Sequence, residues 1–188
     1  MLRVIAGTAR RLQLKTIDGM ETRPTTDRIK ETLFNVIQNE LPGCYFLDLF
    51  SGSGSIGIEA LSRGSRQAYF VENNRKAVMC IKDNLQHTHL TDKAQVMTMD
   101  AISAIRRLEG QGIVFDIIAM DPPYGKELEK DVLCQLSDSS LVGPDTVIVV
   151  EADLETEFDY AESLGFYIEK QKLYKTNQHV FIRKIEER

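Results

Sequence analysis

The chain has 188 residues, of which 43% are hydrophobic and 27% are charged, and this is the composition of an ordinary soluble globular protein. That length is enough for one domain with a complete core and a small appendage. No apolar run approaches the roughly 20 residues of a membrane span, and the N-terminus lacks the apolar stretch of a signal peptide, so we expect a cytoplasmic protein without membrane segments.

The net charge of −5 is unevenly distributed along the chain. Residues 1–17 contain four cations and no acid, so the remaining 171 residues carry a charge of −9. A basic arm on an acidic body indicates that nucleic acid binds at the arm, and a merely solvated basic end is the alternative. The candidate nucleic-acid-binding residues of the arm are Arg3, Arg10, Arg11 and Lys15.

The cysteines and histidines give no sign of a metal site. Three cysteines, Cys44, Cys80 and Cys134, lie far apart, which argues against a disulfide framework and against a zinc motif. We expect all three to be buried as small apolar residues. His87 and His89 are two positions apart on one predicted helix and therefore face different sides. We predict no bound metal.

The N-terminal segment, residues 1–22, shows a brief alternation of apolar and polar residues around a turn, which predicts a short β-hairpin. A polar linker follows, in which Thr25 or Thr26 can cap a helix that runs to about Glu40. The sequence therefore predicts a basic hairpin extension over residues 1–22 and a main domain over residues 23–188.

From residue 44 onward, predicted strands and helices alternate. The strands are predicted at 44–49, 67–72, 94–98, 114–120 and 146–151. The helices are predicted at 55–63, 74–87, 101–108, 127–136 and 157–163. This alternation predicts a Rossmann-like α/β fold, in which helices cover both faces of a mostly parallel sheet. Two final runs, 166–174 and 179–183, have no room for a helix between them and should pair as an antiparallel hairpin.

A loop rich in small residues follows the first strand of the main domain. Asp48 ends that strand, and the loop and the start of the next helix contain Ser51, Gly52, Gly54 and Gly57. Glycine allows the backbone to approach a ligand closely, and a helix start offers unpaired N–H groups. The segment predicts a site for a nucleotide-like ligand, and a plain strand–helix turn is the alternative.

The acid at the end of this strand indicates which ligand the loop binds. The glycine spacing fits the dinucleotide-binding fingerprint, which by itself is a weak signal. A carboxylate at Asp48 would repel a pyrophosphate, but it would attract the cationic ammonium and sulfonium groups of S-adenosylmethionine. We therefore expect S-adenosylmethionine as the cofactor.

Acidic residues also follow the next two predicted strands, and ligands of open parallel sheets bind outside the carboxyl ends of the strands. Glu72, which lies 15 residues past Gly57, has two acceptor oxygens that suit the two hydroxyls of a ribose. Asp100 could accept a hydrogen bond from an adenine amino group, although by itself it is also typical of a helix N-cap. The predicted cofactor site includes their neighbours Asn73 and Ala101.

The fourth predicted strand is followed by Asp-Pro-Pro-Tyr, residues 121–124. The two prolines lack N–H donors, so the carbonyls of Asp121 and Pro122 are expected to be unpaired. Together with the Asp121 carboxylate they form a cluster of acceptors whose complement is an amino group. The ring of Tyr124 offers a flat face on which a base could stack. We predict that Asp121, Pro122 and Tyr124 are catalytic, and a rigid turn is the alternative.

These motifs, together with residues 23–35 and 48–64, resemble the RsmD family of bacterial 16S ribosomal RNA (guanine-N2) methyltransferases, and the resemblance covers nearly the whole chain. It implies a class I methyltransferase fold for the main domain and S-adenosylmethionine as cofactor. It also implies 16S ribosomal RNA, or a small-subunit assembly particle, as partner. By the same resemblance, Arg23, Thr25 and Thr26 would fold over the amino-acid end of the cofactor.

Three alternatives remain open from the sequence. The first is an amino-methyltransferase that acts on another RNA base or on DNA. The second is a nicotinamide-dependent oxidoreductase, which leaves Asp48 and residues 121–124 unexplained. The third is a non-catalytic RNA-binding module, against which the intact acceptor cluster argues. We expect the protein to be a monomer.

Overall fold

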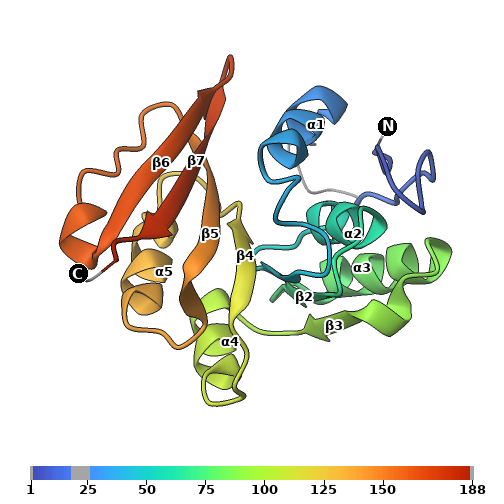
Figure 1. Cartoon of the computed structure of the whole chain (residues 1–188). Coiled ribbons are helices and arrows are strands. Elements are labelled where there is room, and N and C mark those ends of the chain that lie inside the picture. The colour runs from blue at the N-terminus through green and yellow to red at the C-terminus, as the bar shows by residue number, and fades with distance from the viewer. Residues whose placement is uncertain (1, 18–25, 187–188) are drawn as a thin grey trace.

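The computed structural model describes residues 2–17 and 26–186, and its centre is a seven-stranded sheet of order β3-β2-β1-β4-β5-β7-β6 (Figure 1). The strands are β1 (Tyr45–Asp48), β2 (Gln67–Val71), β3 (Ala94–Met97), β4 (Phe115–Met120), β5 (Val142–Asp153), β6 (Phe166–Leu173) and β7 (Asn177–Lys184). The helices are α1 (Asp27–Val36), α2 (Ser55–Ser62), α3 (Arg75–His87), α4 (Ala101–Leu108) and α5 (Leu128–Ser137), with 3₁₀ turns η1 (Thr91–Lys93) and η2 (Glu162–Leu164).

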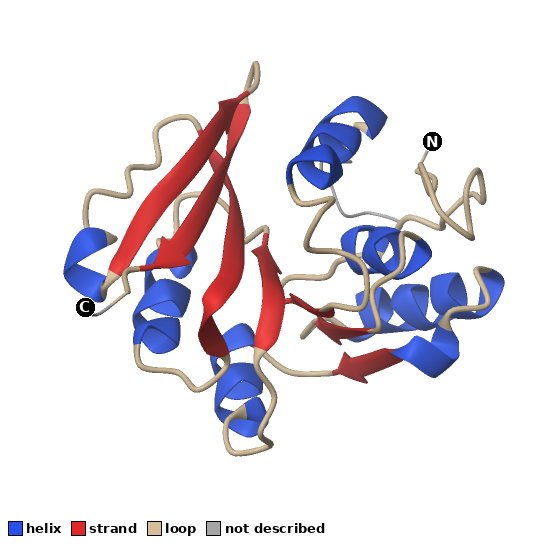
Figure 2. Cartoon of the chain, in the orientation of Figure 1, coloured by secondary structure: helices blue, strands red, loops and turns tan. Residues whose placement is uncertain are grey.

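The strand pairing is parallel in one part of the sheet and antiparallel in the other. Strands β1 to β5 pair in parallel, whereas β7 pairs antiparallel with both β5 and β6. Figure 2 shows the strands as one twisted sheet with helices on both sides. The predicted α/β fold, with its mostly parallel sheet and closing antiparallel hairpin, is confirmed.

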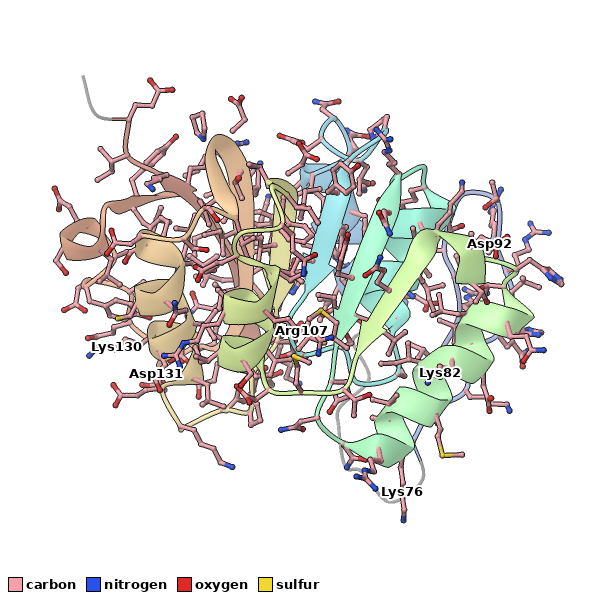
Figure 3. All side chains as sticks on the ribbon, turned by 90° about the horizontal axis from the view of Figure 1, so that it is seen from below. Lys76, Lys82, Asp92, Arg107, Lys130 and Asp131 are labelled. Carbon is pink, nitrogen blue, oxygen red and sulfur yellow. The ribbon has the colours of Figure 1, made fainter. Side chains whose placement is uncertain are left out.

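Each face of the sheet has its own apolar core, because successive residues of a strand point to opposite faces. Leu47 belongs to a first cluster with the buried sides of α4 and α5, and its neighbour Phe46 belongs to a second cluster with α1, α2 and α3. We call the sheet face that bears the second cluster the α1 face. Charged side chains cover the outside of these layers, as Lys76 and Lys82 on α3 and Lys130 on α5 illustrate (Figure 3).

The N-terminal segment, residues 2–17, folds back on itself as predicted, but it forms only one β-bridge, between Arg3 and Gln13. The backbone N–H of Val4 donates to the carbonyl of Leu12 at 3.0 Å. Its apolar residues Leu2, Val4, Ala9 and Leu14 are buried in the second cluster. The proposed division of the chain at residue 22 lies outside the described residues and stays a prediction.

A buried carboxylate on α2 anchors this segment to the main domain. Glu59 is fully buried and accepts the backbone N–H groups of Ile5 and Ala6 at 2.8 and 3.0 Å. The ammonium group of Lys30 on α1, also fully buried, lies 3.4 Å from the same carboxylate. Close packing fixes the turn as well, because a Cβ on Gly7 would lie 1.8 Å from the carbonyl oxygen of Ser62. Residue 7 must therefore be glycine for the segment to lie this close to α2.

The helix predicted over residues 157–163 is wrong. This stretch contains only the 3₁₀ turn η2, which ends at Gly165 in a left-handed conformation. The carboxylate of Asp153 instead accepts the backbone N–H of Glu155 and the hydroxyl of Thr156, and such local bonds favour a turn over a helix. The apolar spacing suggested a helix, but Phe158 is buried in the first cluster even though this stretch is not helical.

Three smaller predictions also need correction. The first helix, α1, ends at Val36 rather than near Glu40, because a turn follows in which the N–H of Glu40 donates to the carbonyl of Ile37. Cys134 is exposed rather than buried, whereas Cys44 and Cys80 are buried as predicted. His89 lies beyond the end of α3, in a left-handed conformation, so it does not share a helix with His87.

Among the described residues, no helix has both the length and the apolar character that a membrane crossing requires.

Candidate active site

The carboxyl ends of the parallel strands bring the predicted cofactor residues to one edge of the sheet. A cavity of about 190 Å³ lies there, between the loops that follow β1, β2 and β3 and the start of α5. Glu72, Asn73, Asp100 and Ala101 all line it, together with apolar side chains such as Met99. A cavity with apolar walls and a few convergent polar groups is typical of a small-molecule site.

The glycine loop between β1 and α2 has the backbone geometry that its sequence suggests. Gly52 and Gly54 have φ angles of +53° and +83°, which other residues adopt only under strain. A Cβ on Gly52 would meet no atom within 4 Å, so this side of the loop is open. Gly57 has a different role, because a Cβ there would lie 2.4 Å from the ring of Phe70. It allows α2 to pack closely against β2.

Asp48 lies beneath this loop and is only 3% exposed. Burial raises the pKa of its carboxyl group to about 7, the backbone N–H of Gly57 opposes the rise, and the carboxylate of Glu72 adds to it. Among the described residues, the oxygen Oδ2 has no hydrogen-bond partner. A buried carboxyl oxygen without a hydrogen-bond partner is unfavourable, so Asp48 is suited to a cationic or hydrogen-donating ligand.

Glu72 connects the glycine loop to α3. Its Oε2 accepts the backbone N–H of Gly52 at 2.9 Å, and its Oε1 accepts that of Asn74 at 2.8 Å. Each carboxylate oxygen can accept a second hydrogen bond, so these contacts leave capacity for two ribose hydroxyls. The sequence suggested only the ligand-binding role, and the structure adds that Glu72 fixes the loop.

Two other predicted cofactor residues cap helices. Asp100 accepts the backbone N–H and the hydroxyl of Ser103 at 2.9 and 2.7 Å, and the backbone N–H lowers the pKa of Asp100 most. Thr26 accepts the backbone N–H of Ile29 at 3.3 Å at the start of α1. Ser51 is buried, and its hydroxyl donates to the carbonyl of Asp48 at 2.9 Å. Arg23 and Thr25 lie outside the described residues.

The Asp-Pro-Pro-Tyr segment follows β4 directly. Pro122 is buried, and Tyr124 is 49% exposed. Although part of Asp121 reaches solvent, the surrounding protein desolvates its carboxyl group and raises its pKa well above the usual value. The carboxylates of Glu151 and Asp48 raise this pKa further. The segment therefore places an acceptor of raised basicity beside the glycine loop.

The prediction from the sequence missed a polar group next to Asp121. Glu151 near the end of β5 accepts the side-chain N–H of Asn177 at 2.8 Å, and Nε2 of the buried His179 lies 3.2 Å from it. The hydroxyl of Tyr174 lies 3.2 Å from the other ring nitrogen of this histidine. One signal could have revealed Glu151, since the predicted strand 146–151 ends in an acid as its neighbours do.

The four cations of the N-terminal segment have different surroundings. Arg3 pairs with Asp27 at 2.7 Å, and Lys15 pairs with Asp83 at 2.9 Å, both at the surface. Arg10 and Arg11 are exposed and form no ion pair within residues 2–17 and 26–186. The same described part of the chain contains no group of three or more His, Cys, Asp or Glu side chains that could hold a metal ion.

Comparisons with known proteins agree with this geometry. A family model described as Conserved hypothetical protein 95 matches residues 2–183. Ribosomal RNA small subunit methyltransferase D of Haemophilus influenzae is 33% identical over 81% of this chain and 79% of that protein. A Bacillus subtilis relative, named as the rRNA methyltransferase YlbH, is 39% identical over 91% of this chain and 92% of its own length. The chain belongs to the RsmD family.

The fold of this RsmD-family chain is also similar to those of solved structures. The Escherichia coli protein yhhF, described as a methyltransferase, is 29% identical and superposes over 98% of each chain with a TM-score of 0.85. The Haemophilus influenzae protein HI0767, described as a methylase, is 27% identical and has a TM-score of 0.82 over 98% of this chain and 99% of that one. The fold is therefore that of the class I methyltransferases.

Proposed function

We propose that this RsmD-family protein transfers a methyl group from S-adenosylmethionine to the exocyclic N2 amine of a guanine in 16S ribosomal RNA, as a cytoplasmic monomer. The observation that carries the proposal is the acceptor cluster at residues 121–124, which lies at the same sheet edge as the glycine loop and the cavity lined by Glu72. The relatives named as small-subunit ribosomal RNA methyltransferases support the RNA as substrate, either free or in an assembly particle.

The residues present fit the proposed cofactor. The unpartnered oxygen of Asp48 and the carboxylate of Glu72 would hold its cationic and ribose parts, while Asp100 and Ala101 would border its base. Arg23, Thr25 and Thr26 would cover its amino-acid end. When bound, S-adenosylmethionine supplies an electrophilic methyl group on a sulfonium, so the protein needs no metal ion and no covalent intermediate.

The work left to the protein is to prepare the nucleophile, because the lone pair of the guanine amine is delocalised into the ring. The Asp121 carboxylate and the Pro122 carbonyl would accept the two N–H groups, which orients the nitrogen and stabilises the positive charge that develops on it. Tyr124 would stack on the base. A paired guanine must first leave its helix, which costs roughly a few kcal/mol.

The direct test is methyl incorporation into small-subunit particles from a strain that lacks this gene, followed by mass mapping of the methylated nucleosides. A single N2-methylguanine in the 16S RNA is the expected product. Calorimetric titration with S-adenosylmethionine and with NADH tests the cofactor independently. Binding of NADH alone would favour the oxidoreductase, and cofactor binding without any methyl incorporation would favour the non-catalytic module.

Glu72→Ala is expected to weaken S-adenosylmethionine binding by about 1.5–3 kcal/mol, the range for hydrogen bonds to a charged group. The reason is twofold, because the carboxylate would bind the ribose and also holds the backbone N–H groups of Gly52 and Asn74. Calorimetry on the folded variant measures the effect. Unchanged cofactor affinity would contradict the assignment.

Arg10→Glu combined with Arg11→Glu is expected to weaken RNA binding and to flatten its salt dependence. Each phosphate contact contributes about 0.7 to the slope of log K against log salt on single strands, so two contacts contribute roughly 1.4. Reversing two exposed charges leaves the buried apolar residues of the segment intact. Filter binding at several salt concentrations gives the slope.

The matched control reverses Lys76 and Lys82, which project from the outer side of α3 (Figure 3). It makes the same change in net charge at a different surface. If the Arg10 and Arg11 variant loses no more affinity than this control, the arm is only a solvated basic end.

A further inference from the structure

Glu151 lies directly beside the proposed methyl-transfer site, as the strand registers show. In the parallel pair, Met120 of β4 is opposite Val150 of β5, so Asp121 and Glu151 follow as the next neighbours. In the antiparallel pair, Glu151 of β5 is opposite His179 of β7. Three side chains from neighbouring strands therefore lie in one row at the carboxyl edge of the sheet.

The alternation of side chains places this row on the α1 face. Ala119, Val149 and Phe181 all pack in the second cluster. Asp121, Glu151 and His179 are each two residues away from one of these, and residues two apart on a strand share a face. Since Phe46 packs in the same cluster, Asp48 faces this side too. The carboxylates of Glu151 and Asp48 both raise the pKa of Asp121, which agrees with this placement.

The carboxylate of Glu151 is held in one orientation. Asn177 donates to Oε1 at 2.8 Å, and Nε2 of His179 lies 3.2 Å from Oε2. The Tyr174 hydroxyl lies 3.2 Å from the other ring nitrogen of His179, so the imidazole ring bridges Glu151 and Tyr174. The side chain of Glu151 remains 15% exposed, so it is within reach of a ligand, and each oxygen keeps one acceptor position.

The row is rich in acceptors and poor in donors. Within the described parts of the chain, no Lys or Arg forms an ion pair with Asp121 or Glu151, and Oδ2 of Asp48 has no hydrogen-bond partner at all. The missing complement is therefore a molecule that offers several N–H groups side by side. Guanine does so on its Watson–Crick edge, which presents N1–H next to the two N2–H donors. Adenine presents an acceptor at N1.

Building on the proposed function, we infer that Glu151 accepts the N1–H of the target guanine while Asp121 accepts from its N2 amine, so that Glu151 selects guanine over other amino-bearing bases. An N1 acceptor at that position would meet a carboxylate that has no donor to offer, and it would be rejected for that reason. Asn177, His179 and Tyr174 act as positioning residues, because they fix the carboxylate through which the base is read.

The test compares the wild-type protein with Glu151→Gln on small-subunit RNA that carries either guanosine or 2-aminopurine riboside at the mapped position. The analogue keeps the C2 amine but has an acceptor at N1. The wild-type protein should prefer guanosine in kcat/KM by roughly 10–100-fold, the discrimination of one good base contact. In the Gln variant the preference should fall towards one, because an amide can donate to N1. The analogue also lacks O6. The effect of that loss is the same for both proteins, so it cancels when the preference of the wild-type protein is divided by that of the variant.

Glu151→Asp is the second variant, and its shorter carboxylate should lower guanosine methylation while the preference stays above one. S-adenosylmethionine affinity should be unchanged in both variants, which shows that the main domain still folds. An unchanged preference in Glu151→Gln would overturn the role of Glu151 while the proposed function stands. A wild-type protein that methylates no RNA would overturn both.

Discussion

Asp121→Asn is expected to lower kcat by about 10²-fold or more, as the loss of one preorganised electrostatic group does. The amide keeps the shape of the side chain, but it removes the charge that would stabilise the nitrogen as it becomes positive. It also turns one acceptor into a donor that would face the N–H groups of the substrate. S-adenosylmethionine affinity should change much less, since the proposed cofactor contacts involve Glu72, which lines the cavity and holds the glycine loop. Single-turnover methylation and calorimetry separate the two quantities.

The pH profile adds a second readout. The pKa of Asp121 is raised by the desolvation of its carboxyl group, by Glu151 and by Asp48, and only the ionised form carries the negative charge that would stabilise the nitrogen. Wild-type turnover should therefore fall as pH decreases through that raised pKa, and Asp121→Asn should lose this limb of the profile. Asp92→Asn, a surface substitution in η1 (Figure 3), is the matched control and should leave kcat unchanged. Near-normal turnover of Asp121→Asn would contradict the proposed role.

Asp48→Asn is expected to remove a large part of the pH dependence of stability. Burial raises the pKa of Asp48 from 3.8 to about 7, so the folded state favours the protonated form. The stability that this group contributes is fully present below about pH 4 and is lost as pH rises through about 7. This rise in pKa corresponds to roughly 4 kcal/mol, so the free energy of unfolding should fall by that order between pH 4 and pH 8. The neutral amide cannot lose a proton, so its variant lacks this decrease.

Urea unfolding of the cofactor-free protein at several pH values measures the effect. The unfolding free energy of Asp48→Asn minus that of the wild type should increase with pH. A constant loss of stability caused by the amide would not change this trend. Asp100→Asn is a control of opposite sign, because the pKa of Asp100 is lowered, so its carboxylate stabilises the fold above pH 3.8 and loses that effect as pH falls. Parallel pH curves for Asp48→Asn and wild type would show that Asp48 does not titrate in this range.

The sequence by itself determined the features that depend on local chemistry. The spacing of apolar residues predicts which segments are strands and which are helices. An acid or glycine directly after a strand lies at the carboxyl end of that strand, however the distant parts of the chain are arranged. For this reason Glu72, Asp100 and the Asp-Pro-Pro-Tyr segment could be assigned to one edge of a parallel sheet before the structure was known. The same kind of prediction was wrong at residues 157–163. There the side chain of Asp153 stabilises a turn, and Phe158 is buried in the core without a helix.

Only the tertiary structure decided which distant side chains meet. The register between β5 and β7 places His179 against Glu151, and neither residue has a local pattern that encodes this pairing. The N-terminal segment is a second example, because its four cations suggested a basic arm for nucleic acid, whereas the structure buries the apolar residues between them in the second cluster. Lys30 and Glu59 illustrate the reason, because two charged residues on separate helices resemble surface residues in the sequence. Packing removes both from water, and the cost of that desolvation is offset only by contacts that the complete fold creates.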